Sequence, residues 1–166
     1  MGMVPTNVQR NLKGVAGVHF VVAQLSLRGF VALPTTRNLK SFDIVAFRDV
    51  ARMVFIQVKS TDRSKSGWPV FTVPADGTWQ DALTQSVSLG TNFYVFVELP
   101  NASRTEPGYY IVPSQDVAQM LHQDLTDWLT RRGKETPGRQ LLAWGYGGVK
   151  PAAIAKYRDK WEILDD

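Results

Sequence analysis

Residues 42–59, which read FDIVAFRDVARMVFIQVK, decide the fold that we expect for this chain. Two runs rich in β-branched and aromatic residues, 42–47 and 53–59, stand on either side of a short stretch, 48–52, that carries three charged side chains. Short apolar runs separated by a few polar residues are typical of a β-hairpin. We therefore predict two antiparallel strands joined by a tight loop.

The register of this hairpin brings an acid, an amide and a lysine together. When the loop is centred on Val50, residues at equal distances from Val50 face one another, so Asp43 lies opposite Gln57. Side chains alternate between the two faces of a strand, so Lys59 shares the face of Gln57 and of its partner. The opposite face, directed to the core, carries the apolar residues Ile44, Ile56 and Val58.

Two interpretations of this polar face stay open. A carboxylate and an amide oxygen can hold Mg²⁺, and a lysine nearby can orient or deprotonate a water molecule and offset charge on a phosphate group. The same residues could instead form a solvated sheet face with a salt bridge between Asp43 and Lys59. The alternation of side chains, taken alone, favours the solvated face.

The rest of the sequence predicts an α/β domain with a mixed sheet. Apolar and small residues at helical spacing precede Gly29, so we expect an N-terminal helix that ends there. Its Gly14 and Gly17 are unfavourable in a helix by roughly 1 kcal/mol each, which indicates close packing against another element. A second amphipathic helix begins at Ser114. The other expected elements are strands at 30–33, 71–73, 93–99 and 109–112, a helix at 78–89, a glycine-rich turn at 145–148 and a short C-terminal segment near 160–163. This αβββαβ order predicts a single domain over residues 1–166, with a C-terminal extension from about residue 133.

Composition and charge restrict the classes of function. The sequence has no cysteine, which excludes disulfides, thiolate metal sites and thiol nucleophiles and favours a cytoplasmic location. Its two histidines are too few for a zinc cluster, and no basic segment leads into a long apolar run at its start, so we expect a soluble protein that is not exported. Residues 1–70 hold ten Lys and Arg against three Asp, a net charge of +7, whereas the remainder has nine basic against twelve acidic residues, a net charge of −3. A basic half favours a polyanionic partner such as nucleic acid.

The hairpin motif resembles the signature of the PD-(D/E)XK nuclease superfamily. Its two halves, Asp43-Ile44-Val45-Ala46 and Phe55-Ile56-Gln57-Val58-Lys59-Ser60, are similar to the family's D…(D/E/Q)xK pattern. The stretch 14–29 resembles the leading helix of restriction-endonuclease-like and Holliday-junction-resolvase-like members, and 109–113 before a helix resembles small bacterial members. The likeness covers roughly residues 10–130 in the order of elements.

The resemblance implies a restriction-endonuclease-like fold and a Mg²⁺-dependent nuclease-like protein that acts on DNA. Asp43 would be a metal ligand, supported by Gln57 and the backbone carbonyl of Val58, and Lys59 would orient water and stabilise charge. Contacts to nucleic acid would come from Arg28, Arg37, Lys40, Arg63, Lys65 and Trp68. Members of the superfamily often dimerise, so a homodimer is a further expectation.

Two departures from the family pattern support an alternative. Many similar members carry a glutamate ligand directly after the helix glycine, where this sequence has Val18, and no glutamate precedes Glu98. Gln57 also replaces an acid, so Asp43 is the only obvious anionic ligand, and one carboxylate holds Mg²⁺ weakly. The alternative is a catalytically inactive nuclease fold that binds nucleic acid or a protein partner with the same face.

Two further features favour structural roles. His19 lies in an apolar helical stretch and is expected to be packed or capped rather than catalytic. The glycines at 145–148, followed by Lys150, lack the spacing of a phosphate-binding P-loop, which favours a simple turn.

Overall fold

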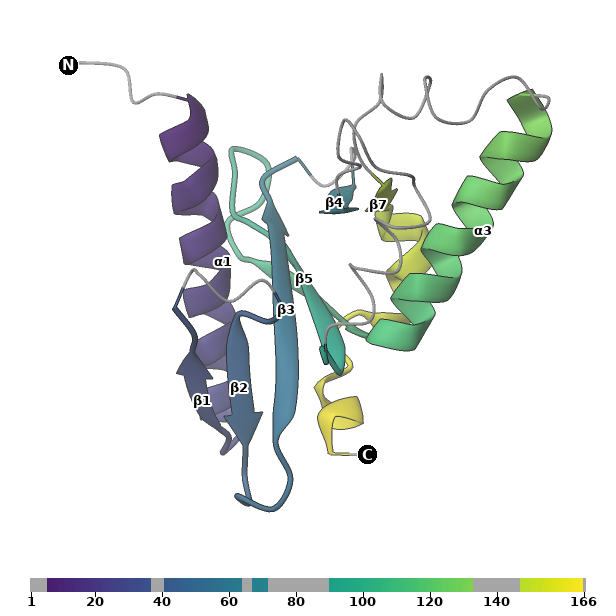
Figure 1. Ribbon diagram of the computed structural model, residues 1–166. Helices are drawn as coiled ribbons and strands as arrows, with labels where there is room; N and C mark the ends of the chain where they lie inside the picture. Colours follow the sequence, from purple (N-terminus) through teal and green to yellow (C-terminus); the bar gives the residue numbers. More distant parts are fainter. Residues whose placement is uncertain (1–5, 37–40, 64–66, 72–89, 133–146, 166) are drawn as a thin grey trace.

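The structure is a computed structural model that describes residues 6–36, 41–63, 67–71, 90–132 and 147–165 (Figure 1). Its helices are α1 (Thr6–Leu27) and α3 (Ser114–Arg132), with the short 3-10 helices η2 (Pro151–Tyr157) and η3 (Trp161–Leu164) later in the chain. Its strands are β1 (Val31–Pro34), β2 (Ile44–Phe47), β3 (Val54–Thr61), β4 (Trp68–Phe71), β5 (Phe93–Glu98), β6 (Gly108–Pro113) and β7 (Gly147–Val149). The predicted α/β class is confirmed; the helix expected at 78–89 lies outside the described residues.

Five strands form one central sheet in the order β1-β2-β3-β5-β6. β3 and β5 run parallel, whereas the other neighbouring strands of this sheet run antiparallel. β4 and β7 pair with each other in a separate two-stranded antiparallel sheet. The mixed central sheet that the order of elements predicted is therefore present.

The β2–β3 hairpin has the register expected from its loop. Ile44 pairs with Ile56 and Ala46 pairs with Val54, so facing residues are equidistant from Val50. Along the first part of β3, buried side chains alternate with half-buried ones. The prediction that Ile44, Ile56 and Val58 form the core face of this hairpin is confirmed.

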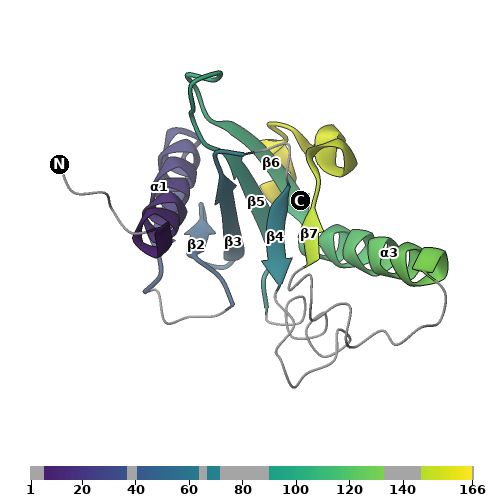
Figure 2. The same cartoon turned by 90° about the horizontal axis from the view of Figure 1, so that it is seen from above.

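The two faces of the central sheet are covered by different elements (Figure 2). α1 packs on one face, where its Val21 and Leu25 are fully buried together with Ile56 of β3. The small β4–β7 sheet, α3 and η2 lie against the other face, around Trp68 and Phe96. The sheet thus divides the core in two, and α1 is held against the hairpin.

Two of the glycines in and after α1 fix how the helix meets the sheet. A Cβ on Gly17 would lie 2.5 Å from the Ser60 Cβ, so only glycine allows this approach of α1 to β3. Gly29 has a φ of +82° and follows the end of the helix, as predicted. A Cβ on Gly14 would meet no atom within 4 Å. The expected close packing is therefore confirmed at Gly17 and wrong at Gly14.

Two local predictions differ from the structure around β4 and β7. The strand expected at 71–73 begins earlier, because Trp68 pairs with Val149; residues 72–73 lie outside the described part. Gly147 and Gly148, expected in a turn, belong to β7, and a Cβ on Gly148 would lie 2.9 Å from the Trp68 carbonyl oxygen. Both strands are short and pair with each other across a long separation in sequence, so neither is evident from its own residues.

The apolar face of α3 begins as predicted. Val117 and Leu121 are buried, and Met120 packs beside them; the side chains of Leu125 and Trp128 lie outside the description. None of the helices in the described ranges is both long and apolar enough to cross a membrane.

Candidate active site

The hairpin residues expected at the site meet where β3 runs on past β2. Ile44, the first residue of β2, pairs with Ile56, so residues 57–61 of β3 extend beyond the hairpin, beside α1 (Figure 1). The Asp43 backbone N–H donates to the Ile56 carbonyl oxygen at 2.8 Å, and its carbonyl accepts from the Thr35 N–H at 2.8 Å. A cavity of about 450 Å³ opens at this point between α1, the end of β1 and β3.

The Asp43 carboxylate is the centre of the contacts in this cavity. The Val58 backbone N–H donates to its Oδ2 atom at 2.8 Å, and the Gln57 amide nitrogen donates to the same oxygen. The charge of Lys59 acts on the carboxylate as well. All four residues line the cavity. The structure thus brings together the residues that the hairpin register placed on one face.

Burial controls the protonation of the charged pair. Burial raises the pKa of Asp43 above its ordinary value of 3.8, while its two hydrogen bonds and the charge of Lys59 act in the opposite direction. Burial likewise lowers the pKa of Lys59, and the Asp43 charge opposes that shift. Tyr94 stands beside Gln57 in the register of β3 and β5; burial, with a smaller effect of Asp43, raises the pKa of its hydroxyl to about 12. A partly buried lysine with a lowered pKa beside a carboxylate is suited to proton transfer.

The α1 side of the cavity includes Val18, which the resemblance had placed at the site, and other residues that the sequence argument did not assign to it. The lining residues from α1 are Arg10, Asn11, Gly14, Val15, Val18 and His19. Val18 shares the cavity with Asp43. His19 is exposed and lines the same cavity, so of the two expected alternatives the packed histidine is wrong. Arg10 precedes Val18 by eight residues, about two helical turns, so the two positions lie on the same side of α1. This spacing could have revealed Arg10 from the sequence.

The oxygen atoms around Asp43 are of the kind that a hard divalent cation binds. A single carboxylate is among these donors. The carboxylate, the Gln57 amide oxygen and the Val58 carbonyl are hard ligands, and that carbonyl points to the same strand edge as the Val58 N–H. The Gln57 amide presents its nitrogen to Asp43, so coordination through its oxygen requires the amide to turn over. Within the described ranges no group of three or more His, Cys, Asp or Glu could hold a metal ion. These residues fit a Mg²⁺ ion that has few protein ligands and is completed by water and substrate oxygens.

Most residues expected to contact nucleic acid lie away from this cavity or outside the description. The Arg28 guanidinium donates to Gln24 and lies 4.6 Å from the centre of the Trp161 ring, at the far end of α1 from the cavity. Arg63 is exposed just after the end of β3. Arg37, Lys40 and Lys65 lie outside the described residues.

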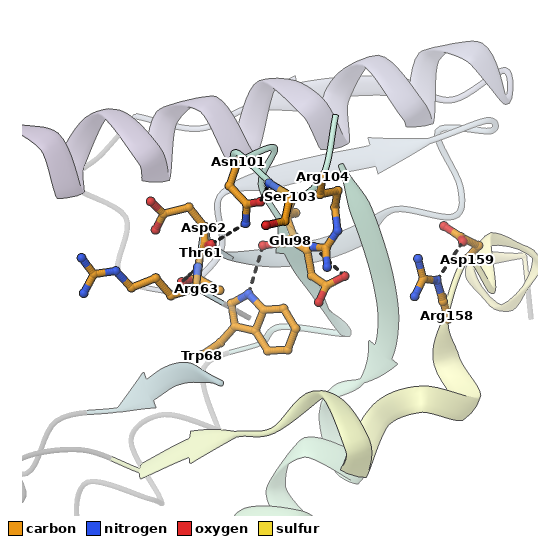
Figure 3. Close-up of polar contacts among 11 residues, drawn as sticks. Thr61, Asp62, Arg63, Trp68, Glu98, Asn101, Ser103, Arg104, Arg158 and Asp159 are labelled. Atoms are coloured by element: carbon orange, nitrogen blue, oxygen red, sulfur yellow. Dashed lines mark hydrogen bonds and ion pairs between the residues drawn. The ribbon is translucent and has the colours of Figure 1, made fainter. Parts of the chain in front are cut away.

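Trp68 is a core residue, which corrects its assignment as a nucleic-acid contact. Its side chain is 1% exposed, and its indole N–H donates to the Val97 carbonyl oxygen at 3.0 Å (Figure 3). Its ring packs against Phe96 and Tyr110, with centroid distances of 5.4 and 5.6 Å. The pairing of β4 with β7 brings Trp68 against β5, and a side chain buried in this way cannot stack on a base.

Comparisons with known proteins assign no family to this chain. No family model matches the sequence, and no curated protein matches it. Among solved structures, the chain is similar to Hjc, a Holliday junction resolvase from the archaeal hyperthermophile Archaeoglobus fulgidus, with 20% identity and a TM-score of 0.39 over 63% of this chain and 75% of that one. At these values the likeness concerns the fold at most, and any assignment of function depends on the geometry of the cavity.

Proposed function

We propose that this chain is a nuclease-like protein of the PD-(D/E)XK type that acts with Mg²⁺ on phosphodiester bonds, with DNA as its substrate. The observation that carries the proposal is the convergence of Asp43, Gln57 and Lys59 on one cavity at the open end of the β2–β3 hairpin. A carboxylate, an amide oxygen and a lysine are groups that a metal-assisted hydrolysis of a phosphodiester uses.

Each residue has a role that follows from its position. Asp43, with Gln57 and the Val58 carbonyl, would hold the cation, which would supply positive charge against the negative charge that builds on the phosphate. Lys59 orients the attacking water and balances charge on the phosphate. Because burial lowers the pKa of Lys59, its neutral form is reached at a lower pH than for a free lysine, which favours removal of a proton from that water.

A second candidate function has its own supporting observation. Asp43 is the only acidic side chain among the described residues that line the cavity. The resemblance described above also implies that Val18 occupies the position at which members of the superfamily carry a glutamate. A divalent cation needs more than one carboxylate for tight binding unless the substrate supplies further oxygens. The alternative is therefore a catalytically inactive protein that binds nucleic acid or a protein partner through the same cavity.

The test compares DNA cleavage and DNA binding in one set of variants. Supercoiled, single-stranded and branched DNA are incubated with the protein in Mg²⁺, in Mn²⁺ and in EDTA. We expect metal-dependent cleavage that falls by about 100-fold or more in Asp43→Asn and Lys59→Met. The matched control is Asp49→Asn, an exposed hairpin-loop aspartate that does not line the cavity, and it should cleave as the wild type does.

The outcomes separate the two candidate functions. If the protein binds DNA but cleaves it in neither metal, the inactive binding protein becomes the favoured function in place of the nuclease. If the protein neither binds nor cleaves DNA, a nucleic-acid function is overturned altogether. Cleavage that survives both cavity variants would show that the activity does not belong to this site.

A further inference from the structure

The two glycines inside α1 have different surroundings. Gly17 is needed because α1 lies against Ser60 of β3 at that point. Gly14 is exposed, and a Cβ there would meet no atom within 4 Å. A glycine in a helix interior destabilises the helix by roughly 0.8–1.0 kcal/mol relative to alanine. Packing therefore does not account for glycine at position 14, and the helical backbone there does not require it.

Gly14 does line the cavity, in the middle of its α1 wall. Arg10 precedes it by four residues and Val18 follows it by four, so the three positions share one face of the helix. Asp43 and Lys59 line the same cavity from the hairpin side. Because position 14 has no side chain, the α1 wall at this point is bare helix backbone, and the atoms of a ligand can approach it closely.

The charges around the cavity favour an anionic ligand. Arg10 and Lys59 are cationic, and Asp43 is the one acidic residue among the described lining residues. The balance of these three side chains is one positive charge, beside the polar groups of Asn11 and Thr35. A backbone phosphate carries one negative charge and accepts hydrogen bonds, so it matches this lining in both respects.

We propose that Gly14 is the position of α1 that admits the substrate. The missing side chain allows a backbone phosphate of nucleic acid to lie against the helix, with Arg10 balancing its charge and with the neighbouring phosphodiester directed toward Asp43 and Lys59. This inference rests on the proposed function and adds which wall of the cavity the nucleic-acid backbone follows.

Substitutions at Gly14 separate this role from a structural one, because stability and binding should change in opposite directions. Gly14→Ala and Gly14→Leu should both raise the melting temperature, since either residue is a better helix former and its Cβ has open space. Affinity for a labelled DNA oligonucleotide, measured by fluorescence anisotropy in EDTA, should fall slightly for Gly14→Ala and by about tenfold or more for Gly14→Leu. A merely structural glycine would give no loss of affinity in a protein that has become more stable.

The matched control places the same side chain elsewhere on α1. Ala23 is exposed and does not line the cavity, so Ala23→Leu should leave the affinity unchanged. Gly17→Ala should lower the melting temperature because of the contact with Ser60, which verifies that the two glycines differ.

The outcomes distinguish this inference from the proposed function. If the wild type binds DNA and Gly14→Leu binds equally well, the inference is overturned and the nucleic-acid function stands. If Gly14→Leu binds weakly and the wild type binds but does not cleave in Mg²⁺, the inference stands and the catalytic proposal fails. A wild type that binds no DNA overturns both.

Discussion

At the scale of single residues, Asp43 is held in a half-buried position by two hydrogen bonds from β3. Because burial raises its pKa in the folded protein above 3.8, the folded state binds the proton more tightly than the unfolded state does. The stabilising contribution of this carboxyl is therefore complete below pH 3.8 and is lost as the pH rises through the raised pKa.

This linkage predicts how the variant Asp43→Asn differs from the wild type. Over the window from pH 3.8 upward to neutral pH, the free energy of unfolding of the wild type should decline relative to that of the variant, because asparagine does not titrate. Urea denaturation at a series of pH values measures this difference. A difference that stays constant across the window would mean that the pKa of Asp43 is not raised.

The same variant should lower the pKa of Lys59 still further. Burial is the larger cause of the shift at Lys59, and the Asp43 carboxylate is the group that opposes it. An NMR titration of the Lys59 side chain in the two proteins measures the effect. An unchanged or higher pKa in Asp43→Asn would show that the two charges do not interact as the structure indicates.

Val18→Glu is predicted to strengthen binding of divalent metal. Val18 lines the cavity with Asp43, so a carboxylate there would give a doubly charged cation a second anionic ligand. Val18 is also half-buried against the core, so without metal the new carboxylate should lower the free energy of unfolding by about 1–3 kcal/mol. Calorimetric titration with Mg²⁺ and Mn²⁺, with melting curves in each condition, measures both effects.

The control for this variant is Ala23→Glu, which adds the same charge to an exposed part of α1 away from the cavity. It should leave metal affinity as in the wild type. If Val18→Glu folds and also binds metal no better than the wild type, the side chain at position 18 does not reach Asp43.

At the scale of elements, the connection between β5 and β6 is held by a buried ion pair (Figure 3). Glu98, at the end of β5, is 3% exposed, and its Oε2 atom lies 2.8 Å from the Arg104 Nη1 atom. No aligned hydrogen bond reaches that oxygen within the described residues, so the contact is electrostatic. Gly108 leaves the space that this carboxylate occupies, because a Cβ there would lie 2.8 Å from Oε2.

Arg104→Met is therefore predicted to destabilise the protein. Removing the arginine leaves a buried carboxylate without its charge partner, which should lower the free energy of unfolding by about 3 kcal/mol. This value is at the lower end of the range for such pairs because Arg104 is partly exposed. Urea denaturation at neutral pH measures the loss. The double variant Glu98→Gln with Arg104→Met leaves no buried charge unpaired at this contact, so it should recover most of the lost free energy of unfolding. Equal losses in the single and double variants would contradict this account.

At the scale of the whole molecule, the charge asymmetry predicts a salt-dependent interaction with nucleic acid. Residues 1–70 carry a net charge of +7, and Arg10 and Lys59 of this half line the cavity. Lys and Arg that contact phosphates release counterions, so log K should fall linearly with log salt, by about 0.9 for each contact with duplex DNA. Binding titrations over a range of salt concentrations measure the slope.

Arg10→Ala should reduce the magnitude of this slope by about 0.9. The control Lys160→Ala removes an exposed lysine that pairs with Glu162 in the C-terminal half, and it should leave the slope unchanged. A wild-type affinity that does not depend on salt would argue against a polyanionic partner.

The sequence by itself determined the hairpin and the side chains on its two faces. Strand alternation has a period of two and depends only on backbone geometry, and a short loop leaves little choice of register, so the approach of Gln57 to Asp43 followed from positions 42–59 alone. The end of α1 near Gly29 was equally local, because a residue with positive φ stops the helix there.

Only the tertiary structure decided which residues surround that hairpin. Trp68 stands in a basic loop by its neighbours in sequence, but its pairing with Val149 and its hydrogen bond to Val97 bury it. His19 is surrounded by apolar residues in sequence and is exposed at the cavity, because its side of α1 meets the open end of β3. Contacts of this kind join residues far apart along the chain, and they depend on how whole elements pack rather than on any local period.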